Sequence, residues 1–126
     1  MQLGDLEKQV LHTLWQQAPA SAKEVYAILS KSRDGSLNTI QSTLDRLFKK
    51  ELLSRTKEGH AWYYSPRIER RQMIAKMINQ ATEEFAEHQQ SGLIAAFASM
   101  SEELDAKQLD ELEAMIQERR QALEGR

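Results

Sequence analysis

The polar side chains of residues 36–50, SLNTIQSTLDRLFKK, form the pattern with the most definite chemistry in this chain of 126 residues. At about 100° per residue, the apolar residues of this segment fall on one stripe of a helix. The opposite face is small and hydroxylic in its first half and basic in its second. Short polar side chains let a helix approach base edges in the major groove of DNA, and basic ones reach guanine edges or phosphates. The residues predicted to contact DNA from the helix over residues 37–50 are Asn38, Thr39, Ser42, Arg46, Lys49 and Lys50. A simple amphipathic helix with a polar outer face would show the same pattern.

A second group of basic side chains follows in residues 54–65. Two short runs rich in aromatic and polar residues flank a Gly-containing turn here, which predicts a β-hairpin, or wing. Such a ribbon can lie along the phosphate backbone or the minor groove. Its candidate DNA-binding residues are Arg55, Lys57 and His60. Trp62 and Tyr64 share one face of the hairpin and Ala61 and Tyr63 the other, and core packing of at least one pair is favoured over base stacking.

Three predicted helices lead up to the hairpin. The first covers about residues 3–17, and a capping box of Ser21 and Glu24 opens the second. Gly35 is predicted to take the left-handed conformation at the end of the second helix. Ser36 is predicted to cap the third. The order helix, helix, helix, hairpin is typical of a winged helix-turn-helix domain.

We assign residues 1–66 to this DNA-binding domain and residues 67–126 to a second, purely helical domain. The predicted fold is therefore mainly α, with a winged helix followed by three helices, the last capped by Asp105 with Gln108. Three short helices make a poor independent core, so their apolar faces are expected to pack against a second copy of the chain. The residues predicted to form this dimer are Ile74, Met77, Ile78, Phe85, Leu93, Phe97, Leu109, Leu112 and Ile116.

The net charge of −2 conceals a basic first part and an acidic second part. Residues 1–71 contain 12 Lys and Arg against 8 Asp and Glu, whereas residues 72–126 contain 5 against 11. This asymmetry predicts two modules with different partners.

The sequence shows none of the common catalytic patterns. Its three histidines are far apart, it has no cysteine, and it has no Gly-rich phosphate loop. We therefore expect a protein that is not an enzyme and that binds neither a metal nor a cofactor. The N-terminus lacks the features of a signal peptide and no apolar run is long enough to span a bilayer, so we expect a cytoplasmic protein with no membrane partner.

Four stretches match a known family in order and in spacing: LGDLEKQVLHTLW, ASAKEVYAIL, NTIQSTLDRLFKKELL and KEGHAWYYSP. Together they resemble the BlaI/MecI/CopY family of bacterial repressors, also called penicillinase repressors. The resemblance is close over about the first 66 residues and extends to the layout of the helical remainder. It implies a homodimer with an N-terminal winged helix and a C-terminal three-helix dimerisation domain. It also implies binding to inverted-repeat operators, often with TACA/TGTA cores, that blocks transcription.

The resemblance places Ser21 where the second helix meets the phosphate backbone, with amides there that can favour an anion.

Two residues in or just after the helix over residues 37–50 do not fit the family pattern or DNA binding directly. Family members commonly carry Gly after the Lys pair, whereas this chain has Glu51, which bears on the tightness of the turn into the wing. Asp45 would oppose the DNA phosphates unless it pairs with Lys49 at i+4.

The inducing signal is a separate question. Family members from antibiotic resistance are inactivated by proteolysis near an Asn-Phe bond, and this chain has Ala96 before Phe97, which leaves induction by that cleavage open. Copper-responsive members of the family carry a C-terminal cysteine cluster, and this chain has no cysteine, so we expect no copper sensing of that kind.

Two other functions fit the same elements. A winged helix can serve as a protein–protein adaptor without DNA. The chain could also be a one-component regulator that binds a small ligand at the dimer interface, which would require a cavity in its second half. Binding to DNA that weakens steeply with salt discriminates the repressor from the adaptor.

Overall fold

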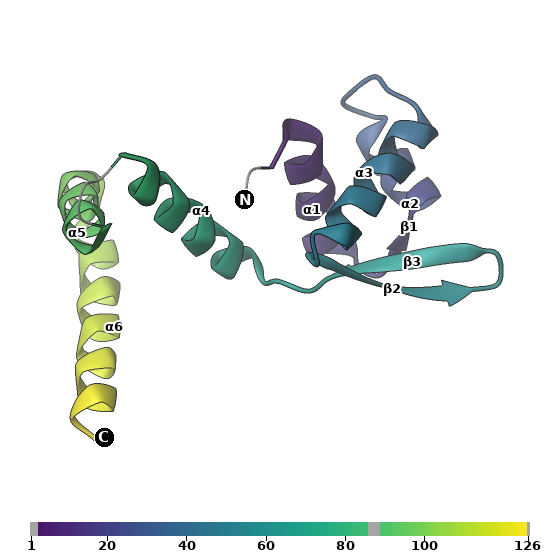
Figure 1. Ribbon diagram of the computed structural model, residues 1–126. Coiled ribbons are helices and arrows are strands. Elements are labelled where there is room, and N and C mark those ends of the chain that lie inside the picture. The colour runs from purple at the N-terminus through teal and green to yellow at the C-terminus, as the bar shows by residue number, and fades with distance from the viewer. Residues whose placement is uncertain (1–2, 86–88, 126) are drawn as a thin grey trace. The chain divides into compact units, whose positions relative to one another are not determined.

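The computed structural model describes residues 3–85 and 89–125, which divide into two compact units (Figure 1). The first unit is Met1–Ile78 and the second is Asn79–Arg126. The division falls within a helix that starts in the first unit. The predicted domain boundary after residue 66 stays a prediction.

The first unit contains three helices whose starts are set by local sequence. Their bounds are α1 Asp5–Gln17, α2 Ala22–Leu29 and α3 Leu37–Lys49. The predicted caps are confirmed, because Ser21 Oγ accepts from Glu24 N–H at 3.2 Å and Ser36 Oγ accepts from Thr39 N–H at 3.2 Å. The prediction for Gly35 is wrong. Helix α2 already ends at Leu29, and Gly35, with φ 150°, lies just before the cap of α3 instead.

A three-stranded antiparallel sheet with the order β1–β3–β2 completes the winged helix. The strands are β1 Ala20–Ser21, β2 Leu53–Glu58 and β3 Ala61–Pro66. Strands β2 and β3 form the predicted hairpin around Gly59, whose φ of 62° suits the first position of a two-residue hairpin loop. Strand β1 was not predicted. Its two residues pair with Tyr64 and Tyr63 of β3.

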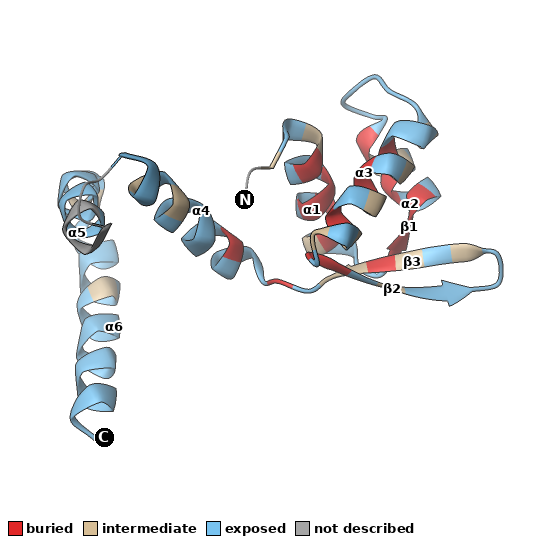
Figure 2. Ribbon diagram, viewed as in Figure 1, coloured by how far each residue is buried: buried red, intermediate tan, exposed pale blue. Residues whose placement is uncertain are grey.

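The core of this unit lies where the three helices face the base of the sheet (Figure 2). The predicted stripe of α3 is confirmed, and the side chains that fill the core include Val10, Leu11, Leu14, Val25, Leu29, Ile40, Leu44, Leu47, Leu53 and Tyr64. Tyr64 is fully buried, whereas Trp62 on the same face of the hairpin is exposed. Thr43 is a polar member of the core whose hydroxyl donates to Thr39 O at 2.7 Å. The base of the hairpin is therefore anchored in the core by Tyr64, and the end that carries Trp62 and the loop projects into solvent.

The turn between α3 and β2 is tight although it lacks glycine. Glu51 takes the left-handed conformation with φ 65°. Its N–H donates to Phe48 O and the N–H of Leu52 donates to Leu47 O, both at 3.0 Å. These two bonds form a Schellman motif, and Leu47 and Leu52, the two residues that its second bond joins, are both buried in the hydrophobic core.

Helices α4 Arg70–Phe85, α5 Gln89–Met100 and α6 Ala106–Glu124 follow, with a short 3₁₀ helix at Ser101–Glu103. The predicted cap of α6 is confirmed, because Asp105 Oδ1 accepts from Gln108 N–H at 2.8 Å. None of the described helices is both long and apolar enough to cross a membrane. No described side chain between residues 79 and 125 is buried.

The apolar residues predicted to form a dimer are therefore uncovered in the single chain. Leu112 is half-buried, and the exposed members of the set are Ile74, Met77, Ile78, Phe85, Leu93, Phe97, Leu109 and Ile116. Ile74 and Met77 lie in the first unit, where they line a cleft beside α1. The other members from Phe85 onward belong to the second unit.

Candidate nucleic-acid interface

The outer face of α3 is exposed to solvent and polar, and the side chains on its first half are short. Its exposed residues are Asn38, Thr39, Ser42, Arg46 and Lys49. Two hydroxyls turn back onto their own helix, because Ser42 Oγ donates to Asn38 O at 2.9 Å and Thr39 Oγ1 lies 3.0 Å from Ser36 Oγ. This arrangement keeps the first two turns narrow, as a helix needs when its backbone approaches base edges.

Arg46 lies one turn beyond Ser42 and is anchored at its head group. One Nη2–H donates to the hydroxyl of the buried Thr43 at 3.0 Å. A guanidinium has five N–H donors, and this bond uses one of them. The contact fixes the direction of the side chain along the outer face of α3.

Lys50, predicted to contact a phosphate, is instead held within the protein. Its ammonium forms an ion pair with Glu7 Oε2 at 2.7 Å. Glu7 Oε1 also accepts from the N–H of Gly4 at 3.0 Å, so the same carboxylate caps α1 and ties it to the end of α3. Burial raises the pKa of Glu7, but the hydrogen bonds from Lys50 and Gly4 and the charges of Lys50 and Arg46 outweigh burial and lower that pKa below its ordinary value.

Arg55 is also engaged inside the protein, between α3 and the wing. Its guanidinium lies 4.0 Å from the centre of the Phe48 ring and 4.4 Å from the centre of the Trp62 ring. Its Nη1 lies 3.6 Å from Asp45 Oδ1. Asp45 is therefore neutralised by Arg55 on β2, and not by Lys49 as the helical spacing had suggested. These four side chains, Asp45, Phe48, Arg55 and Trp62, are called the Arg55 clamp below.

A hollow of about 310 Å³ lies between the start of α2, the start of α3 and the wing. Ser21 and His60, which were predicted separately as DNA contacts, both line it, together with Lys23, Gln41 and Trp62, which were not among the predicted contacts. The sequence could have indicated Lys23 as a candidate contact, because it is a cation in the first turn of a helix with a recognisable cap. Gln41 did not, because only the fold brings its amide to 3.4 Å from Tyr64 OH.

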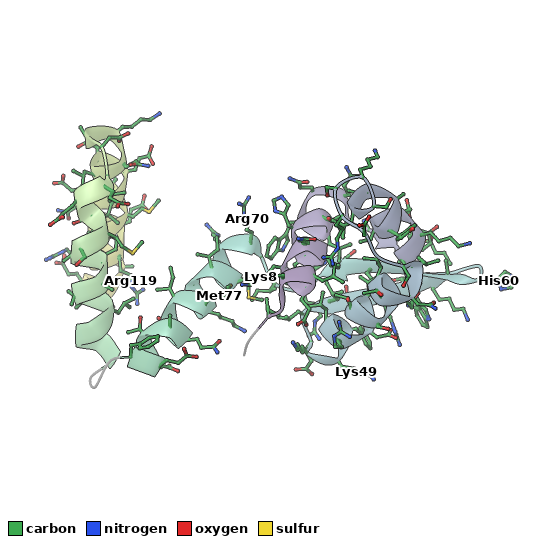
Figure 3. All side chains as sticks on the ribbon, turned by 90° about the horizontal axis from the view of Figure 1, so that it is seen from above. Lys8, Lys49, His60, Arg70, Met77 and Arg119 are labelled. Atoms are coloured by element: carbon green, nitrogen blue, oxygen red, sulfur yellow. The ribbon has the colours of Figure 1, made fainter. Side chains whose placement is uncertain are left out.

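The wing itself carries two more of the predicted DNA-binding residues. His60 lies in its loop, as Figure 3 shows, and Lys57 Nζ lies 5.7 Å from the centre of the Trp62 ring. Ser21 is nearly buried, and the Ser21 and Glu24 amides are used by the capping box. These two amides are therefore not available to an anion at the start of α2, and the anion site there stays a prediction.

The described residues contain no cluster of side chains that could form a metal centre. Within residues 3–85 and 89–125, no group of three or more His, Cys, Asp or Glu side chains is placed to hold a metal ion. His88 lies outside the described residues.

The penicillinase repressor family model matches residues 3–118, which span the winged helix and nearly all of the second unit. This chain belongs to the penicillinase repressor family. The match confirms the resemblance derived from the four stretches of sequence.

Individual members of the penicillinase repressor family align along almost the whole chain. The penicillinase repressor of Bacillus licheniformis is 28% identical over 117 residues, covering 93% of this chain and 91% of the relative. The transcriptional regulator BlaI of Mycobacterium tuberculosis is 31% identical over 118 residues, covering 92% and 83%. The solution structure of the DNA-binding domain of the repressor BlaI matches with a TM-score of 0.51 and 38% identity, covering 55% of this chain and 84% of that one.

Proposed function

We propose that this chain is a homodimeric transcriptional repressor that binds an inverted-repeat operator through α3 and the wing. The observation that carries the proposal is the exposed outer face of α3, where small polar side chains are followed by two cations. Its membership of the penicillinase repressor family supports the same function. A repressor acts on the chromosome, so the proposal places the protein in the cytoplasm.

The proposed contacts fall into three groups. Asn38, Thr39 and Ser42 meet base edges in the major groove, where their short side chains let α3 approach. Arg46 reaches a guanine edge or a phosphate, and Lys49 meets the phosphate backbone.

The wing and the adjacent hollow supply the remaining contacts. Lys23, Lys57 and His60 lie along the phosphate backbone beside the groove that α3 enters. Lys50 and Arg55 act as positioning residues, because Glu7 and the Arg55 clamp hold them within the protein.

The second unit provides the two-fold symmetry that an inverted repeat requires. Its exposed apolar residues pack against those of a second copy, and the two recognition helices then lie in successive major grooves. A dimer bound over a promoter excludes RNA polymerase. The acidic character of residues 72–126 does not prevent binding, because local charge governs the encounter with DNA.

Fluorescence anisotropy with a labelled duplex tests the proposal. The duplex carries an inverted TACA/TGTA repeat, and a scrambled duplex of equal composition is the comparison. Arg46→Ala removes one contact from each half-site and is expected to cost about 2–6 kcal/mol of binding free energy for the dimer. Lys107→Ala is the matched control, because Lys107 is an exposed cation of α6 on the side of the helix opposite Leu112 and Ile116, and it should leave the affinity unchanged.

The salt dependence separates base contacts from phosphate contacts. Lys49→Gln removes one phosphate contact from each protomer, so the slope of log K against log salt should fall by about 1.8. Equal affinity for the repeat and the scrambled duplex, with equal effects of Arg46→Ala and Lys107→Ala, would show that the proposed function is wrong and would favour a protein–protein adaptor.

A further inference from the structure

The first unit contains a cleft of about 570 Å³ that the proposed DNA contacts do not use. It lies between α1, the end of α2 and the first half of α4. Its volume falls within the range of about 300–1,000 Å³ that is typical of small-molecule sites. The ligand-sensing alternative required a cavity in the second half of the chain, whereas this cleft lies within residues 3–77.

The inner wall of the cleft is apolar and rigid. Leu11, Leu29 and Met73 are buried members of the hydrophobic core. Trp15 is held in place by its indole N–H, which donates to Ile68 O at 2.9 Å. A ring fixed at its polar end presents an apolar face, and this favours an apolar ligand body.

The outer rim of the cleft is cationic. Lys8 on α1 and Arg70 at the start of α4 line it (Figure 3). His12 lines it as well. No Asp or Glu belongs to the described residues that line the cleft. The acidic residues next to these two cations along the chain are engaged elsewhere, because Glu69 Oε2 lies 3.2 Å from Arg71 Nε and Glu7 Oε2 lies 2.7 Å from Lys50 Nζ.

The other polar groups of the rim are satisfied within the protein. Gln9 Oε1 accepts from Arg33 at 3.1 Å, and Thr13 Oγ1 donates to Gln9 O at 3.0 Å. The described residues provide no ion-pair partner for Lys8 or Arg70. An apolar wall below two unneutralised cations is complementary to an amphipathic anion.

We propose that this cleft binds a small organic carboxylate, with an aromatic or aliphatic body against Trp15 and Met73 and its carboxylate between Lys8 and Arg70. The walls come from α1 of the winged helix and from α4, which continues into the second unit. The site is independent of the proposed DNA contacts, so its existence can be tested without DNA.

The test is a titration of the full chain with 4-phenylbutyrate, followed by ¹H–¹⁵N correlation spectra, with 4-phenyl-1-butanol as the uncharged comparison. The chain has two tryptophans. The indole N–H signal of Trp15 should shift and saturate, whereas that of Trp62 on the wing should not move. The acid should bind more tightly than the alcohol, because only the acid pairs with the cationic rim.

Charge variants locate the carboxylate. Lys8→Gln and Arg70→Gln should each weaken binding of 4-phenylbutyrate by up to about fivefold, as expected for exposed ion pairs, and should leave binding of the alcohol unchanged. Lys76→Gln is the control, because Lys76 is also an exposed cation of α4 and does not line the cleft.

Three results would overturn the proposal. The first is the lack of a saturable Trp15 shift with millimolar acid. The second is equal affinity for acid and alcohol with no effect of Lys8→Gln or Arg70→Gln. The third is a Trp15 signal that moves when the protein alone is diluted, since this would assign the cleft to a second copy of the chain.

Discussion

Replacing Arg55 by Ala should detach the wing from α3 and destabilise the first unit. The guanidinium contacts two rings, at 4.0 and 4.4 Å, and each partly exposed cation–π contact is worth about 0.5–1 kcal/mol. The ion pair with Asp45, at 3.6 Å and on the protein surface, adds at most about 1 kcal/mol. The expected loss in free energy of unfolding is therefore about 1–3 kcal/mol.

Urea denaturation monitored by tryptophan fluorescence measures this loss, with all variants compared at one protomer concentration because a dimer's stability depends on it. Asp45→Asn removes only the ion pair and should cost at most about 1 kcal/mol. Arg55→Lys keeps the charge but loses the planar group that stacks on the rings, so its effect should be intermediate. Lys57→Ala, toward the free end of the same strand, should cost at most about 0.5 kcal/mol, because Lys57 Nζ lies 5.7 Å from the centre of the Trp62 ring, close to the limit of about 6 Å for a cation–π contact.

Comparing Arg55→Ala with Asp45→Asn separates the contribution of the two ring contacts from that of the ion pair. If Arg55→Ala costs no more than Asp45→Asn, the two ring contacts contribute nothing and the reasoning from stacking is wrong. The double variant should cost no more than Arg55→Ala alone, because both substitutions remove the same ion pair.

Three further predictions concern single positions of the first unit. Glu51→Gly should raise the free energy of unfolding by about 0.5–1 kcal/mol in urea titrations, because glycine adopts a φ of 65° without the cost that Glu bears there; a decrease would mean that the Glu51 side chain makes a stabilising contact. The lowered pKa of Glu7 means that its stabilisation is complete above the ordinary Glu range and is lost as the pH falls through the lowered value. The difference in stability between wild type and Glu7→Gln should therefore shrink in acid, and a difference that is constant with pH would contradict the assignment. Ser21→Ala removes the cap of α2 and should lower the free energy of unfolding, measured by thermal denaturation, by about 1 kcal/mol. An unchanged stability would show that the cap is unimportant.

The features that local sequence specifies were predictable from the chain. Ser21, Ser36 and Asp105 cap their helices through residues three positions later, so the pattern is visible without a fold. The same holds for the hairpin around Gly59, where the turn residue and the flanking aromatic residues act together.

The features that the sequence did not reveal depend on residues distant in the chain. Glu7 and Lys50 are 43 positions apart, and only the packing of α1 on α3 brings them together. Asp45 had an apparent partner in Lys49 at helical spacing, but the hairpin places Arg55 against it. Strand β1 has two residues, too few for any periodicity, and it exists because β3 offers an edge.

The lack of buried side chains among the described residues after Ile78 has a consequence for how such a repressor responds to its own abundance. If two chains must meet before this part has a core, its folding free energy depends on concentration, and each tenfold dilution removes about 1.4 kcal/mol. While most chains are single, the amount of operator-competent dimer follows the square of the protomer concentration. A small change in the synthesis or degradation of the chain then produces a larger change in promoter occupancy, so the uncovered helices set a threshold for repression.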